Sequence, residues 1–188
     1  MERRSLLKML TVAPFAALTA PIVTHTLATP PKNMQGIDEL QKSWKTLLAA
    51  GTEVPAVTPK LELSKDEWRK RLSPQAYSVL REDGTERAGT SPLDREKRPG
   101  VFACAGCGLP LFTSAMKFDS GTGWPSFFTT IPGAFATKKD FKIIFPRTEY
   151  HCARCGGHHG HIFDDGPPPT GLRYCNNGVA LKFIPQTI

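Results

Sequence analysis

Five cysteines dominate the chemistry that this sequence could perform, and four of them form two identical short spacings. Each Cys-x-x-Cys turn directs two sulfur atoms to one point, and two such turns supply the four thiolates of a tetrahedral zinc site. Because four thiolates leave no open coordination position, the spacing predicts one structural Zn²⁺ ion. Forty-four residues separate the two turns, so the fold must bring two loops together. The predicted ligands are Cys104, Cys107, Cys152 and Cys155.

Two other interpretations of these four cysteines were weighed against zinc. A pair of disulfides suits an oxidising compartment, but a bond within a Cys-x-x-Cys turn closes a strained ring, whereas metal binding uses that spacing routinely. A thioredoxin-type redox pair needs a strand-to-helix junction in a βαβ unit, and neither turn has one. Zinc is therefore the favoured interpretation.

The fifth cysteine, Cys175, stands alone in the segment GLRYCNNG near the C-terminus. Three histidines precede it, His158, His159 and His161, and Arg173 lies two residues before it. A cysteine with acid–base histidines and a cation has the parts of nucleophilic thiol chemistry. If this segment is a strand, Arg173 shares a face with Cys175 and lowers the pKa of its thiol. The alternative is a buried cysteine that packs as a small apolar side chain.

The secondary structure that must position these residues is predicted to change from helices to strands along the chain. Apolar residues at helical spacing predict an outlying amphipathic helix over 37–50. A capping box at 64–67 and a serine–proline pair at 73–74 open two further helices, the second ending near Gly84. The compact domain is therefore expected to begin near Leu61.

From Gly100 onward the pattern favours strands. Apolar stretches become short and are split by glycine and proline, as in FKIIF (141–145) and VALKF (179–183). Helices confined to the front and short strands behind them indicate an α+β, mostly β domain with antiparallel pairing.

The first 28 residues follow the plan of an export signal. Arg3 and Arg4 precede an apolar run of about fifteen residues, which is shorter than the ~20 residues of a membrane span. The paired arginines resemble a twin-arginine signal, so we expect cleavage near Ala28 and a periplasmic protein. A retained N-terminal membrane anchor is the alternative. The predicted organisation is a signal over 1–28, a linker and outlying helix over 29–60, and the domain over 61–188.

The charge pattern excludes one class of partner. The formal charge is +7, but no run of five or six like charges and no basic stripe interleaved with aromatic residues occurs. A solvated surface explains these charges better than a nucleic-acid site. We expect a monomer that binds no nucleic acid and stays off the membrane after signal removal.

Several motifs in order resemble one family. They are KFDSGTGWPSF (117–127), the two cysteine turns, GGHHGHIFDDGP (156–167) and GLRYCNNG (171–178). Together they resemble methionine sulfoxide reductase B over roughly residues 63–185. The resemblance implies two small antiparallel sheets with peripheral helices and a structural zinc. It also implies reduction of the R epimer of methionine sulfoxide, mainly in proteins, as a repair reaction in oxidative stress.

The same resemblance assigns roles to single residues. Cys175 is the expected nucleophile, and it becomes a sulfenic acid as methionine departs. Trp124 is expected to hold the substrate methyl group. The residues expected to orient and protonate the sulfoxide oxygen or to tune the site are His158, His161, Asn177, Arg173 and Asp165.

Three positions depart from the family pattern. Thr122 stands where many members carry a second cysteine that resolves the sulfenic acid. With four thiols assigned to zinc, we expect an external, thioredoxin-like thiol to reduce Cys175. His159 replaces the usual leucine, and Gly178 replaces the usual serine.

Two other functions compete with the reductase. A non-catalytic zinc-stabilised binding module would have no use for Cys175, Trp124 and two histidines together. A periplasmic thiol–disulfide exchanger would need one Cys-x-x-Cys pair to be free of metal.

Overall fold

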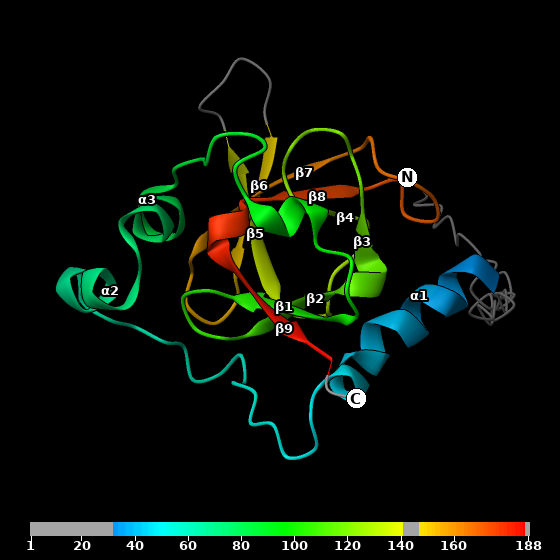
Figure 1. Ribbon diagram of the computed structural model, residues 1–188, viewed down its shortest axis with the longest axis horizontal. Helices are drawn as coiled ribbons and strands as arrows, with labels where there is room; N and C mark the ends of the chain where they lie inside the picture. Colours follow the sequence, from blue (N-terminus) through cyan, green and yellow to red (C-terminus); the bar gives the residue numbers. More distant parts are fainter. Residues whose placement is uncertain (1–31, 141–146, 187–188) are drawn as a thin grey trace, which may run out of the picture.

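The computed structural model describes residues 32–140 and 147–186, and it is mostly β with helices at the front of the chain (Figure 1). One sheet has three antiparallel strands in the order β2-β1-β9. The other has six antiparallel strands in the order β3-β4-β8-β7-β6-β5. The expected α+β, mostly β fold with two antiparallel sheets is therefore confirmed.

The strands are short, as the sequence predicted. They are β1 (Gly100–Cys104), β2 (Pro110–Thr113), β3 (Lys117–Phe118), β4 (Ser126–Phe127), β5 (Phe135–Asp140), β6 (Arg147–Cys152), β7 (His158–Phe163), β8 (Arg173–Asn176) and β9 (Leu181–Pro185). The helices are α1 (Lys32–Lys42), α2 (Lys65–Arg71) and α3 (Pro74–Glu82), with 3₁₀ turns η1 (Ser43–Leu47), η2 (Pro92–Arg95), η3 (Ser114–Met116) and η4 (Gly178–Ala180).

The starts of α2 and α3 confirm the predicted caps. Ser64 and Glu67 form a reciprocal capping box at α2. Ser73 accepts a hydrogen bond from the Ala76 N–H, and proline follows it at the first turn of α3. That helix ends in a left-handed residue, Asp83, with φ of 53°. Side-chain capping thus fixes where this pair of helices begins beside the sheets.

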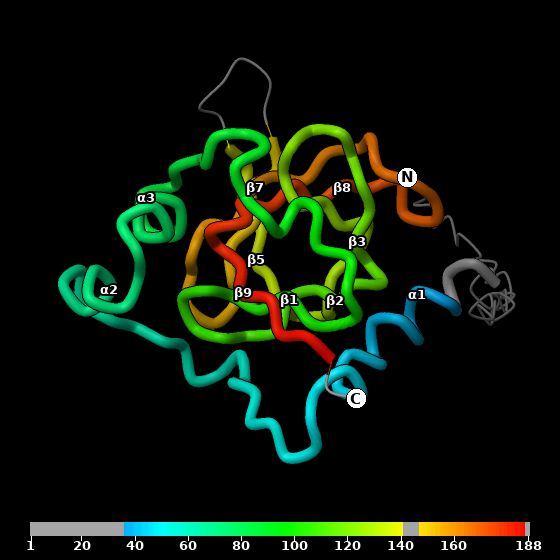
Figure 2. The backbone as a smooth tube through the Cα atoms, in the orientation of Figure 1, coloured from blue at the N-terminus to red at the C-terminus, as the bar shows by residue number. Residues whose placement is uncertain are grey.

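The predicted outlying helix contacts the domain. It begins earlier than expected as α1 and ends as the 3₁₀ turn η1. Leu40 and Trp44 pack against the core, and Gln41 donates a hydrogen bond to Thr129 at 2.7 Å. Residues 48–64 then run along one edge of the molecule to α2 (Figures 1 and 2).

Aromatic rings join the two sheets into one core. Phe127 of the larger sheet stacks on Phe112 of the smaller sheet, with ring centroids 3.9 Å apart. It also meets Phe102 edge to face at 5.1 Å. All three side chains are fully buried. This contact fixes β4, and therefore the neighbouring β8, against the smaller sheet.

The two strands predicted over 141–145 and 179–183 have different outcomes. The predicted strand over 179–183 begins later, at Leu181, because η4 occupies the first residues of that stretch. The stretch 141–145 lies outside the described residues, as do the signal and its cleavage site. Among the helices that the structure describes, none is long and apolar enough to span a membrane.

Candidate active site

Cys175 lies in the middle of the six-stranded sheet. On one side its strand β8 pairs with β4, which places Ser126 opposite Cys175. On the other side it pairs with β7, which places His161 opposite Cys175. Directly opposed residues of antiparallel strands have side chains within contact range. At Gly160 the strands are so close that a Cβ would lie 1.9 Å from the Cys175 carbonyl oxygen, so only glycine fits there.

A cavity of about 120 Å³ opens beside the Cys175 side chain. Such a volume suits the end of one side chain rather than a large cofactor. Its walls combine aromatic and polar groups, as a site for a small polar ligand with an apolar end requires. The lining residues are Thr85, Trp124, Arg147, Gly160, His161, Phe163, Cys175, Asn176 and Asn177. Three predicted site residues therefore join Cys175 here: Trp124, His161 and Asn177.

Glu86, which the sequence did not single out, holds one side of the cavity. Its carbonyl oxygen accepts a hydrogen bond from Trp124 Nε1 at 3.1 Å. Its N–H donates to Asn177 Oδ1 at 2.9 Å. Its carboxylate accepts from the backbone N–H groups of Gly178 at 2.6 Å and Val179 at 3.0 Å. One residue thus positions the aromatic wall and the turn that follows the reactive strand.

Asn177 is largely engaged by the backbone. Besides the Glu86 contact, its Nδ2 donates to the His159 carbonyl oxygen at 2.9 Å, and the side chain is buried. A carboxamide has two donor hydrogens and two acceptor lone pairs. One N–H of Asn177 therefore remains to face a ligand in the cavity.

His161 is held by a buried carboxylate. Its Nε2 lies 2.9 Å from Asp140 Oδ2, and Arg147 Nη2 lies 2.7 Å from the same oxygen. Burial lowers the pKa of His161, and the hydrogen bond to Asp140 acts in the opposite direction. Asp140 and Arg147 carry no recognisable motif, so sequence reasoning missed both.

The three histidines face two ways because β7 contains a bulge. His151 pairs with His158, while Tyr150 pairs with Gly160, which leaves His159 as the extra residue. The bulge turns His158 toward the same side as His161, with ring centroids 5.6 Å apart.

His159 points the other way and belongs to the core. It is fully buried against Phe135 and Tyr150, and its Nδ1 lies 3.2 Å from Asn176 Oδ1. Burial lowers its pKa to about 3, so the ring is neutral. This extra imidazole therefore takes no part in the cavity.

His158 lies behind His161 and outside the cavity lining. Its side chain is 1% exposed, and its Nδ1 lies 2.5 Å from Glu149 Oε1. Burial lowers the pKa of His158 to about 4, against the effect of Glu149. The structure therefore places this predicted site residue next to the cavity rather than in it.

Arg173 and Asp165 form a fixed pair beside the thiol. Arg173 donates two hydrogen bonds to Asp165, each 2.8 Å long. The guanidinium also lies over the Phe163 ring, 4.4 Å from its centroid. This geometry orients the cation on the strand that carries Cys175.

The predicted effect of Arg173 on the pKa of Cys175 is confirmed, because the guanidinium lowers it. Burial raises the pKa of the thiol, and this cause outweighs the lowering by Arg173. Hydrogen bonding from Thr122 also lowers it. Thr122 therefore lies near the Cys175 sulfur, and its hydroxyl lies 2.8 Å from Ser120 Oγ, which in turn lies 2.8 Å from Ser126 Oγ.

The other four cysteines form a separate buried cluster. Their sulfur atoms all lie within 4.8 Å of one another. The sulfur atoms of Cys107 and Cys152 lie 3.5 Å apart and those of Cys104 and Cys155 lie 3.7 Å apart, far beyond the ~2.05 Å of a disulfide. All five cysteines of the chain are free thiols. The donor set fits a closed, four-coordinate metal site and leaves Cys175 as the available thiol.

Cys175 is partly exposed and lines a cavity together with Trp124 and His161, while the other four cysteines form their own cluster. This arrangement is typical of a thiol-dependent oxidoreductase. The profile of the SelR domain matches residues 72–185. Curated relatives include the peptide methionine sulfoxide reductase MsrB of Agrobacterium fabrum, 50% identical over 129 residues that cover 68% of this chain and 96% of that protein.

Two further relatives come from distant organisms. The chloroplastic peptide methionine sulfoxide reductase B1 of Arabidopsis thaliana is 55% identical over 64% of this chain and 60% of its own length. The MsrB of Methanosarcina barkeri is 50% identical over 65% of this chain and 87% of its own length. The chain belongs to the SelR family, the methionine sulfoxide reductases of type B.

Proposed function

We propose that Cys175 is the nucleophile of a peptide-methionine (R)-S-oxide reductase. The chain is an oxidoreductase that reduces methionine (R)-sulfoxide to methionine. The observation that carries the residue assignment is the position of Cys175 in a cavity walled by Trp124 and His161. A non-catalytic binding module is not favoured.

The proposed reaction balances with one thiol. The Cys175 thiolate attacks the sulfoxide sulfur while a proton reaches the oxygen, so a sulfur–sulfur bond forms and the oxygen becomes a hydroxyl on the substrate sulfur. That hydroxyl then moves to the Cys175 sulfur as the sulfur–sulfur bond and the sulfur–oxygen bond of the substrate break. Methionine leaves with two more electrons, and the enzyme keeps the oxygen as a Cys175 sulfenic acid. His161 lies opposite Cys175, lines the cavity, and is a candidate proton donor to the oxygen. Trp124 offers the apolar face for the methyl group.

We further propose that an external thiol completes the cycle. Thr122 occupies the position near Cys175 where many family members carry a resolving cysteine, and the remaining four thiols form their own cluster. Two reduced thiols would convert the sulfenic acid to a thiol and water while forming one disulfide. The resemblance favours a thioredoxin-like donor, and oxidised proteins are the proposed substrates.

The four-cysteine cluster is proposed to hold one Zn²⁺ ion. Its four thiolates leave no coordination position for substrate, so the ion would stabilise the fold and take no part in the chemistry. Metal analysis of purified protein should find one zinc per chain.

Location and assembly remain proposals from the sequence. The twin-arginine-like segment with Arg3 and Arg4 supports export to the periplasm as a folded monomer that leaves the membrane after cleavage. N-terminal sequencing of the protein from a periplasmic extract tests this, and an intact N-terminus in the membrane fraction would support the anchored alternative.

The deciding experiment separates the two epimers. Reduced protein with dithiothreitol should consume only the R epimer of a peptide-like methionine sulfoxide, and Cys175→Ser should abolish the reaction. With one equivalent of substrate and no reductant, a sulfenate-trapping reagent should label Cys175. Failure of folded protein to consume either epimer would refute the function, and an intramolecular disulfide would refute the external-thiol step.

A further inference from the structure

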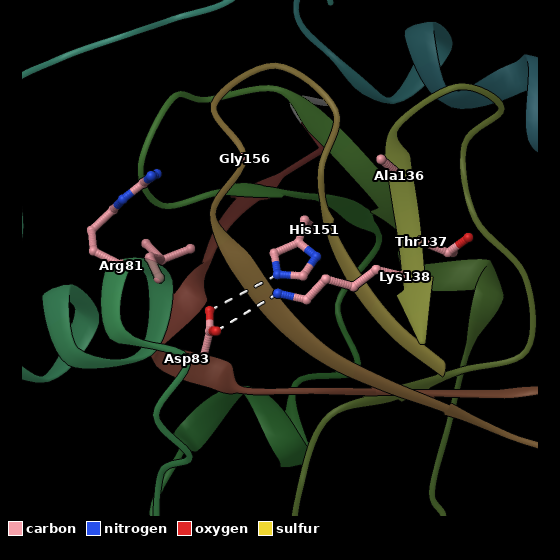
Figure 3. A pocket seen from close by; sticks show the side chains of 8 residues that line it. Arg81, Asp83, Ala136, Thr137, Lys138, His151 and Gly156 are labelled. Atoms are coloured by element: carbon pink, nitrogen blue, oxygen red, sulfur yellow. Dashed lines mark ion pairs between the residues drawn. The ribbon is translucent and has the colours of Figure 1, made fainter. Parts of the chain in front are cut away.

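A second cluster of metal-ligating side chains lies outside the cavity of Cys175. It consists of Asp83 at the end of α3, Glu149 and His151 on β6, and His158 on β7, and we call it the carboxylate–imidazole cluster. Asp83 and His151 also line a surface pocket of about 350 Å³ (Figure 3). Ions can therefore reach the cluster from solvent.

The four candidate donor atoms converge on one point. Each residue offers one atom, and these atoms all lie within 4.8 Å of one another. Glu149 Oε1 lies 3.1 Å from His151 Nε2, and His151 Nε2 lies 3.9 Å from Asp83 Oδ1. Zinc bonds to nitrogen and oxygen of about 2.0–2.1 Å in a tetrahedron place neighbouring donors roughly 3.4 Å apart. Small side-chain movements would therefore complete the geometry.

Two of the four side chains are almost fully buried, and their polar atoms contact each other, His151 and Lys138. Glu149 and His158 are each 1% exposed. Among the described residues, no hydrogen bond of acceptable geometry reaches either carboxylate oxygen of Glu149 or either ring nitrogen of His158. A buried carboxylate is costly unless a positive charge or directed donors compensate it. This pair points to a cationic ligand.

Lys138 now supplies the positive charge at the cluster. Its Nζ lies 3.1 Å from Glu149 Oε2. The same atom lies 3.7 Å from Asp83 Oδ2, an ion pair that Figure 3 draws. The Lys138 side chain is 52% exposed, so it can move into solvent and leave the carboxylates to another cation. An ammonium group cannot take electron pairs from imidazole nitrogens, whereas a metal ion can.

We propose that the carboxylate–imidazole cluster binds a divalent first-row metal ion, with Zn²⁺ as the best fit, when Lys138 swings away. Two imidazoles and two carboxylates match the nitrogen and oxygen preference of Zn²⁺ and neutralise its charge. Imidazole ligands disfavour Mg²⁺ and Ca²⁺, which select oxygen. This site is separate from the four-cysteine cluster and goes beyond the proposed function.

The test measures metal binding rather than turnover, so its outcome does not depend on the reductase activity. Untagged protein that already holds its four-cysteine metal is titrated with Zn²⁺ against a chromophoric chelator, and a second equivalent should bind. His151→Ala and Asp83→Asn should each weaken this second event by at least about tenfold, as loss of a ligand or of its support does. Asparagine keeps the left-handed backbone of position 83.

Lysine variants give the sharper contrast. Lys138→Ala should tighten the second Zn²⁺ by about tenfold, because it removes the competing charge. Lys139→Ala is the matched control on the same strand, since Lys139 Nζ bonds Thr148 instead, and it should change nothing. Asp66→Asn controls for loss of a surface carboxylate.

Defined results would overturn the site. Absence of a second equivalent in both the wild type and Lys138→Ala would exclude it, as would a second equivalent that His151→Ala and Asp83→Asn leave unchanged. Circular dichroism and retention of the four-cysteine metal must first show that each variant is folded. Mg²⁺ and Ca²⁺ at the same concentrations should not displace Zn²⁺, and displacement would contradict the assigned donor set.

Discussion

Glu86→Gln is the most informative single change near the cavity. The Glu86 carboxylate accepts two backbone N–H groups, from Gly178 and Val179, at the turn that follows β8. Glutamine keeps one oxygen and presents an NH₂ group to the second N–H, so one charge-assisted hydrogen bond is lost and two donors face each other. A hydrogen bond to a charged group contributes about 1.5–3 kcal/mol.

We therefore expect Glu86→Gln to lower the free energy of unfolding by about 2–3 kcal/mol. That is a large part of the ~5–15 kcal/mol of a typical domain. The backbone of Glu86 also holds the side chains of Trp124 and Asn177 in the cavity wall. If these side chains move by about 1 Å, turnover of the R epimer should fall by about tenfold to a hundredfold.

Urea unfolding and steady-state kinetics measure the two effects. Glu62→Gln is the matched control, because Glu62 is exposed and distant in sequence from the loop, and it should leave both values unchanged. A Glu86→Gln protein with wild-type stability and wild-type turnover would refute the inference that this carboxylate organises the site. Loss of stability with unchanged turnover would show that the loop supports the fold and not the chemistry.

Three further predictions concern neighbouring positions. Gly178→Ala should cost about 1–3 kcal/mol of stability, because a Cβ at this position would lie 1.8 Å from Ser91 Oγ. Adding Ser91→Gly should restore most of this stability, and a double-mutant cycle measured by urea unfolding tests it. His159 has its pKa lowered by burial from 6.5 to about 3, so the folded state excludes a proton that the unfolded state binds. This residue alone should therefore remove up to about 1.4 kcal/mol of stability per pH unit as the pH falls from 6.5 to about 3. His159→Leu should make the acid limb shallower by that amount while keeping activity, and the lowered pKa of His158 should leave part of the limb in place. An unchanged slope would contradict the burial argument. The rate of Cys175 alkylation should rise with pH, and its midpoint should lie above the usual thiol pKa because burial raises the pKa of Cys175. Arg173→Met should move this midpoint higher still, because it removes the guanidinium that lowers the pKa. A lower midpoint in the variant would contradict that role of the guanidinium.

Local sequence signals predicted the parts of this structure that local physics decides. The caps of α2 and α3 follow from Ser64 and from Ser73 with its proline, because a side-chain acceptor and a fixed φ act within one turn. The two Cys-x-x-Cys spacings predicted the four-cysteine cluster for a different reason: each turn directs two sulfur atoms to one point, and a tetrahedral zinc site needs four. The motifs also placed Trp124, His161 and Cys175 together.

Non-local contacts decided the rest. Glu86 and Asp140 act at the site through Gly178 and His161, which lie far along the chain, and no spacing in the sequence reveals such partners. Arg147 joins the site through Asp140 on the neighbouring strand. The lowering of the pKa of Cys175 by Arg173 could be predicted from their spacing on one strand. Burial, which depends on the whole fold, could not be predicted, and it raises the pKa by more.

The bulge at His159 links the four-cysteine cluster to the reactive thiol. Residues three apart on a regular strand face opposite sides, yet His158 and His161 face the same side because one extra residue intervenes. The turn that carries Cys152 and Cys155 leads directly into β7, and the Cys152 N–H donates to the Gly157 carbonyl oxygen at 2.8 Å. The cluster thus fixes where β7 starts.

A register slip of one residue in β7 would turn His161 away from Cys175, because alternate residues of a strand face opposite sides. The turn at Cys152 and Cys155 prevents that slip by fixing the residue at which pairing with β6 resumes. An ion held by the four cysteines could therefore govern the reaction at Cys175 without touching substrate. The ion would act by fixing the position of the His161 imidazole, which would be held less firmly if the four cysteines bound no ion.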